Sequence, residues 1–204
     1  LTAHYRDEHL FALKQALEAY DFHHEQLRHC DEQIKRVLDL IAAKQVTPQS
    51  PLPPARTKHI RGRNDISFEL RPTLVALTAG VDITQLPGLS PYNGLKLLSE
   101  VGTDMSRFKT EKHFTSWLTL TPHVKASGGR VLSSHTKPSA NRAALIFRMA
   151  AFNLSRTDTA LGAFYRRLSA RIGKAKAVTA TARKLATLFY RLLLHAMILD
   201  TTQA

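Results

Sequence analysis

The chain has 204 residues, of which 44% are hydrophobic and 22% charged, and its 29 Lys and Arg against 16 Asp and Glu give a formal net charge of +13. This composition is typical of a folded protein of one or two domains and excludes a disordered tail. No stretch approaches the ~18 apolar residues of a membrane span, and the single cysteine, Cys30, excludes a disulfide framework. We therefore expect a protein of a reducing, cytoplasmic compartment with no membrane partner.

The first expected element is a long helix over residues 13–41 with an apolar seam. Positions spaced alternately by four and three residues are mostly apolar, and His24 and Asp31 interrupt them as polar residues that set register or partner choice. No Gly or Pro precedes Pro48. The pattern predicts a coiled-coil arm within residues 1–45, formed within the chain or between copies. An amphipathic helix lying on a globular body is the alternative.

A linker and a helical body follow the arm. Four prolines from Pro48 to Pro54 predict an extended spacer over residues 46–65, whose basic run is as consistent with phosphate contacts as with a solvated segment. Residues 66–204 are expected to form an all-α domain, and only residues 129–134 hint at a strand. Helices are expected near residues 66–79, 91–101, 111–119, 138–155, 158–171 and 175–198.

Within this domain, residues 86–102 have the pattern of a helix-hairpin-helix turn. Gly88 would let the backbone approach a phosphate, and Pro91 stands where the second helix should begin. Ser90 replaces the usual second glycine of this hairpin. An ordinary tight connection between two helices is an equally good interpretation.

Residues 121–142 are polar, basic and glycine-containing between two apolar helices. Ser127 is followed by Gly128 and Gly129, with Lys125 and Arg130 on either side. A serine hydroxyl beside cations could attack a phosphodiester, because those charges would stabilise the negative charge that develops at the phosphorus. Residue chemistry alone favours a Ser-Gly-Gly turn whose cations contact backbone phosphates.

The positive charge is concentrated in the C-terminal part of the chain. Residues 121–204 carry fourteen basic side chains against Asp158 and Asp200, whereas residues 1–45 carry six basic and eight acidic ones. So many positive side chains close together repel one another unless a polyanion neutralises them, and nucleic acid is the usual polyanion. A solvated basic surface or attraction to an anionic membrane face are the alternatives. Metal-dependent phosphoryl transfer needs clustered carboxylates, so no metal site is expected in this chain.

Residues 85–145 closely resemble the C-terminal transposase domain of the insertion-sequence-110 family of serine-dependent, RNA-guided DNA recombinases. The resemblance is carried by the segments QLPGLSPYNGLKLLSEVG and KASGGRVLSSHTKPSANRAAL. It continues through residues 160–193, and the arm resembles the coiled coil of longer family members.

The resemblance implies that Ser127 is the nucleophile that forms a covalent link to DNA. Its catalytic partner would be an RNase H-like domain with four acidic ligands for Mg²⁺, which we expect to be missing from this chain, since the chain starts at Leu1 and looks like a fragment. The resemblance also implies dimers and tetramers assembled through the coiled coil, a bridge RNA that pairs with target and donor DNA, and a prokaryotic, nucleoid-associated protein. This chain alone should bind nucleic acid without recombining it.

Lys125 and Arg130 are the expected phosphate contacts beside Ser127. Arg148 and Arg183 are also candidates for pairs or caps within the helical body. The remaining candidates for the nucleic-acid surface are Gly88, Ser90, Gly128, Gly129, Ser134, Lys137, Asn141, Arg142, Lys174, Lys176 and Lys184.

Two other functions remain open at this point. The first is a non-catalytic nucleic-acid-binding module, such as a transposon remnant or an accessory protein. The second is a basic coiled-coil scaffold that binds partners. A steep fall of affinity with salt distinguishes nucleic-acid binding from the scaffold.

Overall fold

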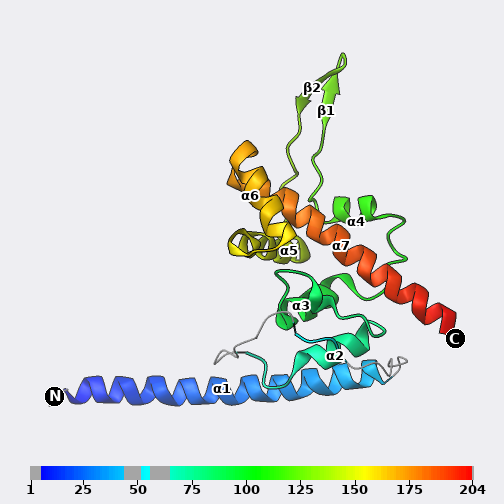
Figure 1. Ribbon diagram of the computed structural model, residues 1–204. Coiled ribbons are helices and arrows are strands. Elements are labelled where there is room, and N and C mark those ends of the chain that lie inside the picture. Colours follow the sequence, from blue (N-terminus) through cyan, green and yellow to red (C-terminus); the bar gives the residue numbers. More distant parts are fainter. Residues whose placement is uncertain (1–5, 44–51, 56–64, 204) are drawn as a thin grey trace.

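A computed structural model of the chain describes residues 6–43, 52–55 and 65–203. These residues form a long helical arm, a helical body above it, and a β-hairpin that projects from the body on the side away from the arm (Figure 1). The described part holds seven α-helices and one two-stranded sheet, which confirms the all-α fold class.

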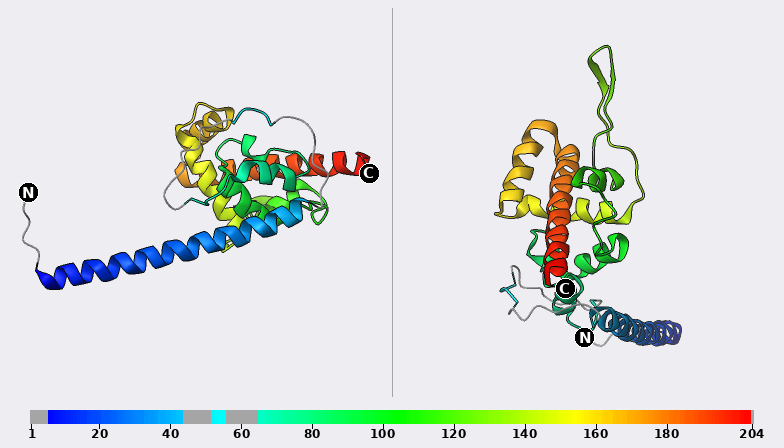
Figure 2. Two further views of the ribbon diagram at one scale, coloured as in Figure 1. Left: turned by 90° about the horizontal axis from the view of Figure 1, so that it is seen from below. Right: turned by 90° about the vertical axis from the view of Figure 1, so that its right-hand side faces the viewer.

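The arm is helix α1, Asp7–Ala42, a single helix of 36 residues. At 1.5 Å per residue it is about 54 Å long. Most of its apolar seam is exposed, with Leu13 at 66%, Leu17 at 56% and Leu27 at 54%, whereas Leu38 is buried. Figure 2 shows the N-terminal part of the arm extending well beyond the body. The predicted long helix is confirmed, and a coiled-coil partner for it stays a prediction.

The C-terminal end of the arm docks on helix α2, Leu70–Leu77. Leu38 joins the core there, and the Asp31 carboxylate accepts a hydrogen bond of 2.7 Å from the backbone N–H of Ser67. Asp31 therefore holds the extended chain that leads into α2, and the helix begins at residue 70 rather than at the expected 66. It ends at Leu77 because Ala79 and Gly80 adopt positive φ angles of 49° and 86°.

A buried ion pair fixes α2 against the short 3₁₀ helix η1, Ile83–Gln85. Arg71 Nη2 lies 2.6 Å from Asp82 Oδ2, and the two side chains are 15% and 4% exposed. Burial by itself raises the pKa of this carboxyl, but hydrogen bonds from Thr84, Arg71 and Gln85 outweigh that effect and hold the pKa below its ordinary value.

Most of the predicted linker lies outside the described residues, and so does its basic run at residues 56–63. Residues 52–55 are exposed and have no regular secondary structure. The carbonyl of Pro53 accepts a hydrogen bond from Arg71, and that of Pro54 accepts one of 3.1 Å from Gln85. This part of the linker therefore lies against α2 and η1.

Helix α7, Lys174–Gln203, is the central helix of the body. It packs against α4, Glu111–Trp117, against α5, Arg142–Asn153, and against α6, Ala160–Ile172. Phe114, Phe147 and Phe189 are fully buried where these helices meet, and the rings of Phe147 and Phe189 lie 5.5 Å apart. The expectation that the last helix is a core helix is confirmed.

Capping side chains set the starts of three helices. Ser90 caps α3, Pro91–Val101, and Thr159 caps α6 through the N–H of Gly162 at 3.1 Å. Asn141 Oδ1 accepts a bond of 3.0 Å from the N–H of Ala144. Because Asn141 is the N-cap, α5 begins at residue 142 rather than at the expected 138. The 3₁₀ helix η2, Leu154–Arg156, connects α5 to α6.

The projecting hairpin consists of β1, Lys125–Ser127, and β2, Arg130–Ser133. The strand pattern expected at residues 129–134 is confirmed as β2, whereas its partner β1 was not predicted. A further hydrogen bond of 2.9 Å, from the N–H of His123 to the carbonyl of His135, extends the pairing toward the body.

Candidate nucleic-acid interface

The tip of the hairpin is a two-residue turn made by Gly128 and Gly129. Ser127 pairs with Arg130 across the turn, and the two glycines have φ angles of 57° and 76°. Positive φ at both central residues defines the type I′ turn that suits the right-handed twist of a hairpin, and glycine adopts it without strain. A Cβ on either glycine would meet no atom within 4 Å, so backbone conformation and not space requires them. The Ser-Gly-Gly turn expected from residue chemistry is thus present.

Strand alternation gives the hairpin two different faces. Lys125 and Ser127 are two residues apart on β1 and share one face, and Arg130 joins them because it pairs with Ser127. We call these three residues the cationic face. Side chains directly opposite each other have Cβ atoms about 5 Å apart, so the side chains of Ser127 and Arg130 leave the backbone side by side on this face, with Lys125 two residues before Ser127.

The opposite face of the hairpin is apolar. Ala126 pairs with Val131 on this side, and Val124 extends the face by two residues toward the body. A shift of register places Leu132 as an extra residue of β2, which is a β-bulge. Val124, Val131 and Leu132 are 55%, 64% and 70% exposed. We call Val124, Ala126, Val131 and Leu132 the apolar face.

Ser127 is exposed, and its hydroxyl has no hydrogen-bond partner among the residues that the structure describes. The hydroxyl can therefore be reached by a large substrate. The described residues place cations beside it but supply no hydrogen-bonded general base. A nucleophilic serine needs such a base, so the base would have to come from elsewhere.

The residues that follow the hairpin divide between free and structural side chains. Ser134 and Lys137 are exposed on the irregular segment that connects β2 to α5. Asn141 caps α5, and the exposed Arg142 forms an ion pair of 3.3 Å with Glu100. The side chains of Asn141 and Arg142 thus have partners within the body.

The basic candidates on the helices lie in different surroundings. Lys174 and Lys176 are exposed in the first turn of α7, where the helix dipole already provides positive potential. Lys184 lies 4.9 Å above the ring of Phe164. Arg148 is half-buried, with no ion pair among the described residues. Arg183 is half-buried as well, and both roles expected for it stay predictions.

Glu111, at the start of α4, lies among basic side chains. The hydrogen bond from Arg191 is the main reason that the pKa of Glu111 lies below its ordinary value. The positive charges of Lys112 and Arg183 add to this lowering. Arg191 is thus the partner that holds the Glu111 carboxylate against α7.

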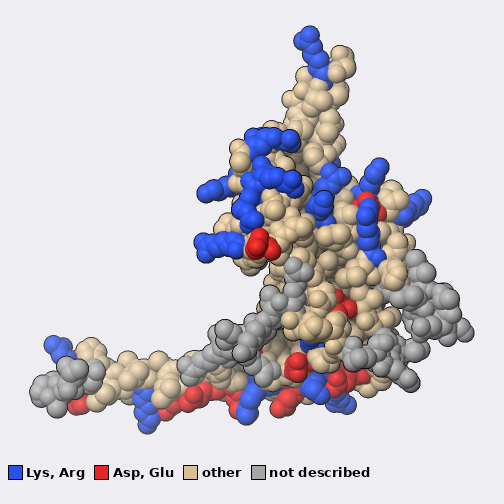
Figure 3. Space-filling model, in the orientation of Figure 1, with Lys and Arg blue, Asp and Glu red and all other residues tan. Residues whose placement is uncertain are grey.

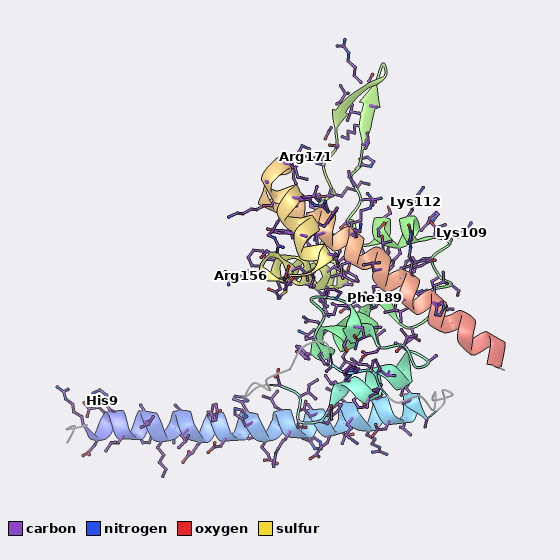
Figure 4. The ribbon with its side chains drawn as sticks, viewed as in Figure 1. His9, Lys109, Lys112, Arg156, Arg171 and Phe189 are labelled. Atoms are coloured by element: carbon purple, nitrogen blue, oxygen red, sulfur yellow. The ribbon has the colours of Figure 1, made fainter. Side chains whose placement is uncertain are left out.

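Several basic residues of the same surface were missed by the sequence analysis. Figure 3 shows Lys and Arg side chains gathered on both sides of the hairpin base, over α6 and over α4. In Figure 4, Arg171 lies at the end of α6 nearest the hairpin, Arg156 near the other end, and Lys109 and Lys112 on the α4 side. Arg166 and Arg167 on α6 are exposed too. For Lys112 and for the α6 residues, the sequence signal that could have identified them is the scarcity of acidic residues after residue 111.

The predicted helix-hairpin-helix turn is only partly formed. The connection before α3 follows a three-residue 3₁₀ helix, not a full α-helix. Gly88 has a φ of 85°, and a Cβ there would lie 2.9 Å from the carbonyl oxygen of Ala150. The hydroxyl of Ser90 accepts the N–H of Asn93 as an N-cap. Gly88 and Ser90 thus have structural roles, and a phosphate contact at either stays a prediction.

Among the described residues, no group of three or more His, Cys, Asp or Glu side chains is placed to hold a metal ion. Within the same part of the chain, no helix combines the length and the apolar character needed to cross a membrane.

Comparison with known proteins adds one match. Residues 82–166 match a family model described as Transposase IS116/IS110/IS902 family. The matched region runs from η1 into α6 and includes the whole hairpin. No curated protein matches the chain. No solved structure matches it either.

Proposed function

This chain carries a transposase region of the IS116/IS110/IS902 family, and from that premise we propose that it takes part in DNA transposition by binding DNA and supplying Ser127 as a nucleophile. A transposase family points to DNA as the partner. The observation that carries the proposal is an exposed serine hydroxyl, flanked by Lys125 and Arg130 on one face of a projecting hairpin inside the matched region.

In the proposed step, Ser127 Oγ attacks the phosphorus of a DNA phosphodiester. A bond forms between Oγ and phosphorus while the bond from phosphorus to one strand oxygen breaks. The serine proton passes to a base, and the leaving oxygen takes up a proton to become a free hydroxyl. The phosphoserine ester keeps the energy of the broken bond, so the reverse reaction can rejoin DNA. Lys125 and Arg130 would stabilise the extra negative charge on the phosphoryl oxygens.

The base and the metal-binding carboxylates belong to another component in this proposal. The described residues of this chain do not fit a magnesium site, and they place no base beside Ser127. An acidic, Mg²⁺-binding domain would complete the site, and Mg²⁺ bound there would neutralise phosphoryl charge. A guide RNA, which the family resemblance implies, would select the DNA sites.

The experiment is a search for a covalent protein–DNA adduct on a denaturing gel. The chain would be mixed with an acidic domain of the same family, candidate guide RNA and labelled DNA. We expect an adduct that disappears in Ser127→Ala and remains in Ser133→Ala, a matched control because Ser133 lies on the same hairpin and pairs with Lys125. DNA binding should survive both changes, since a hydroxyl adds little to an electrostatic interface. An adduct that persists in Ser127→Ala would contradict the assignment.

A second candidate function is a non-catalytic nucleic-acid-binding module. It is favoured by one observation, the missing base at the Ser127 hydroxyl among the described residues. Salt-dependent DNA binding without any adduct in the completed mixture would support this module and contradict the nucleophile.

A further inference from the structure

The apolar face of the hairpin needs a partner. An isolated two-stranded hairpin is marginally stable in water, and here the aliphatic side chains of Val124, Val131 and Leu132 are all more than half exposed. The strands meet the body only at their base, as Figure 2 shows in the view from the side. None of the described residues covers this face.

Charge indicates what kind of partner the hairpin meets. No acidic residue occurs between Glu111 and Asp158, a stretch that includes the hairpin and both of its connections to the body. Lys125, Arg130 and Lys137 are exposed in this stretch without ion pairs among the described residues. The partner must therefore neutralise the cations and also cover the apolar face. Duplex DNA offers both, because its grooves present apolar groups between two rows of phosphates.

Dimensions select one of the two grooves. A two-stranded ribbon with side chains on both faces is about 10 Å thick, by analogy with the spacing of packed sheets. The major groove is about 12 Å wide and the minor groove only about 6 Å, so in undistorted B-form DNA the ribbon fits the major groove alone. Thymine methyl groups, which accept aliphatic contacts, are found only in the major groove. The Gly128–Gly129 tip carries no side chains and can enter first.

We propose that the hairpin inserts tip first into the major groove of duplex DNA. The cationic face lies against the phosphates of one groove wall. The apolar face lies against the sugars of the opposite wall, and Val131, the large aliphatic residue nearest the tip, comes closest to the base edges. This inference rests on the proposed function for its partner, DNA, and adds the groove and the residues that occupy it. The inference gives the apolar face a role in contacting DNA, whereas the proposal for Ser127 as nucleophile does not involve that face.

The test compares two duplexes of one sequence that differ only in the major groove. In the first duplex the cytosines are unmodified, and in the second they carry glucosylated 5-hydroxymethyl groups that fill the major groove. Fluorescence anisotropy at one moderate salt concentration would give the affinity of the full chain for each. We expect about tenfold weaker binding to the glucosylated duplex, equivalent to about 1.4 kcal/mol. Saturating the minor groove with netropsin should leave the affinity for unmodified DNA unchanged.

Two variants identify the residues responsible. Val131→Ser combined with Leu132→Ser should weaken binding to the unmodified duplex and should lose most of the difference between the duplexes. The matched control combines Leu145→Ser with Met149→Ser, because these α5 residues are 56% and 54% exposed but lie outside the hairpin. The control should behave like the unaltered chain. Circular dichroism would verify that both variants keep their helical content.

Each contrary outcome has one meaning. Equal affinity of the unaltered chain for both duplexes would overturn insertion into the major groove. If the Val131→Ser, Leu132→Ser variant still binds the unmodified duplex more tightly than the glucosylated one, the apolar face does not contact DNA. Its partner would then be a protein. If no duplex is bound in a salt-dependent way, the proposed function itself fails, and the inference fails with it.

Discussion

The arginine residues of this chain include residues buried in ion pairs and residues exposed to solvent. Arg71 is 15% exposed and bound to Asp82, whereas Arg130 is exposed at the hairpin tip without an ion pair among the described residues. Removing one partner of a buried pair leaves an uncompensated charge, and an exposed charge stays hydrated. Substitutions at Arg71 or Asp82 should therefore affect stability, and substitutions at Arg130 should affect binding.

For Asp82 this difference gives a prediction that depends on pH. Asp82→Asn should lower the free energy of unfolding at pH 7 by about 3 kcal/mol, because Arg71 then stays buried without its counter-charge. The pKa of Asp82 is lowered in the folded chain. Its stabilisation is therefore complete above the unfolded pKa of about 3.9 and is lost as pH falls through the folded value. Urea denaturation at a series of pH values should show the two proteins converging in acid.

Asp104→Asn is the matched control for this experiment. Asp104 is exposed, and its pKa is lowered as well, chiefly by the side-chain hydrogen bond from Ser106. Its substitution should change stability much less than that of Asp82. If both variants lose the same stability at pH 7, burial of the Arg71–Asp82 pair is not the cause.

At the scale of elements, the arm and the hairpin both expose apolar surface, but they differ in what the surface can pair with. The arm seam repeats with alternating spacings of four and three, which suits the same seam on another helix. The hairpin face is short and surrounded by cations. We therefore propose that the seam mediates self-association and that the hairpin binds nucleic acid.

Self-association through the arm predicts a change of mass. Leu13→Asp combined with Leu17→Asp places two charges in the exposed seam, and light scattering should show the mass falling to roughly half of that of a dimeric chain. Leu38 is unsuitable for this test because it is buried in the body. Substituting it would destabilise the body as well.

Phe22→Asp is the matched control for the arm. Phe22 is 60% exposed but lies two residues from Tyr20 and therefore on the other side of the helix. It should leave the mass unchanged. A mass that is unaffected by the seam substitutions would show that the arm is no contact between copies.

The sequence predicted the elements better than it predicted their ends and partners. Periodicity located α1 because its apolar positions recur over several turns, and Pro91 marked the start of α3. The start of α5 was expected at residue 138. The helix begins at residue 142 instead, because the side chain of Asn141 caps it there. The pairing of β1 with β2 depends on the Gly128–Gly129 turn, which a period count over short strands does not detect. The role of Asp31 was also beyond the pattern, since its partner, Ser67, is 36 residues away.

At the scale of the whole molecule, charge is divided between the two ends of the structure. Acidic side chains lie mainly along the lower side of the arm in Figure 3, and basic ones lie over α6, α4 and the hairpin. We expect this division to orient the chain toward a polyanion with the hairpin first and the arm away from it. In this orientation the arm would remain available to contact protein.

The orientation predicts which cations determine the salt dependence of binding. Each phosphate contact on duplex DNA contributes about −0.9 to the slope of log affinity against log salt. Arg167→Gln combined with Arg171→Gln should therefore make the slope shallower by about 1 to 2 if these α6 residues reach phosphates. Anisotropy titrations of a labelled duplex at five or more salt concentrations would measure it.

The arm supplies a control with the same change of net charge. Lys14→Gln combined with Lys35→Gln removes two cations that are paired with Glu18 at 3.9 Å and with Asp39 at 3.0 Å. Because these lysines lie on the end that faces away from the proposed polyanion, the slope should stay that of the unaltered chain. A slope reduced equally by both pairs would mean that net charge, and not the surface beside the hairpin, determines binding. A slope reduced only by the arm pair would reverse the orientation of the chain on DNA.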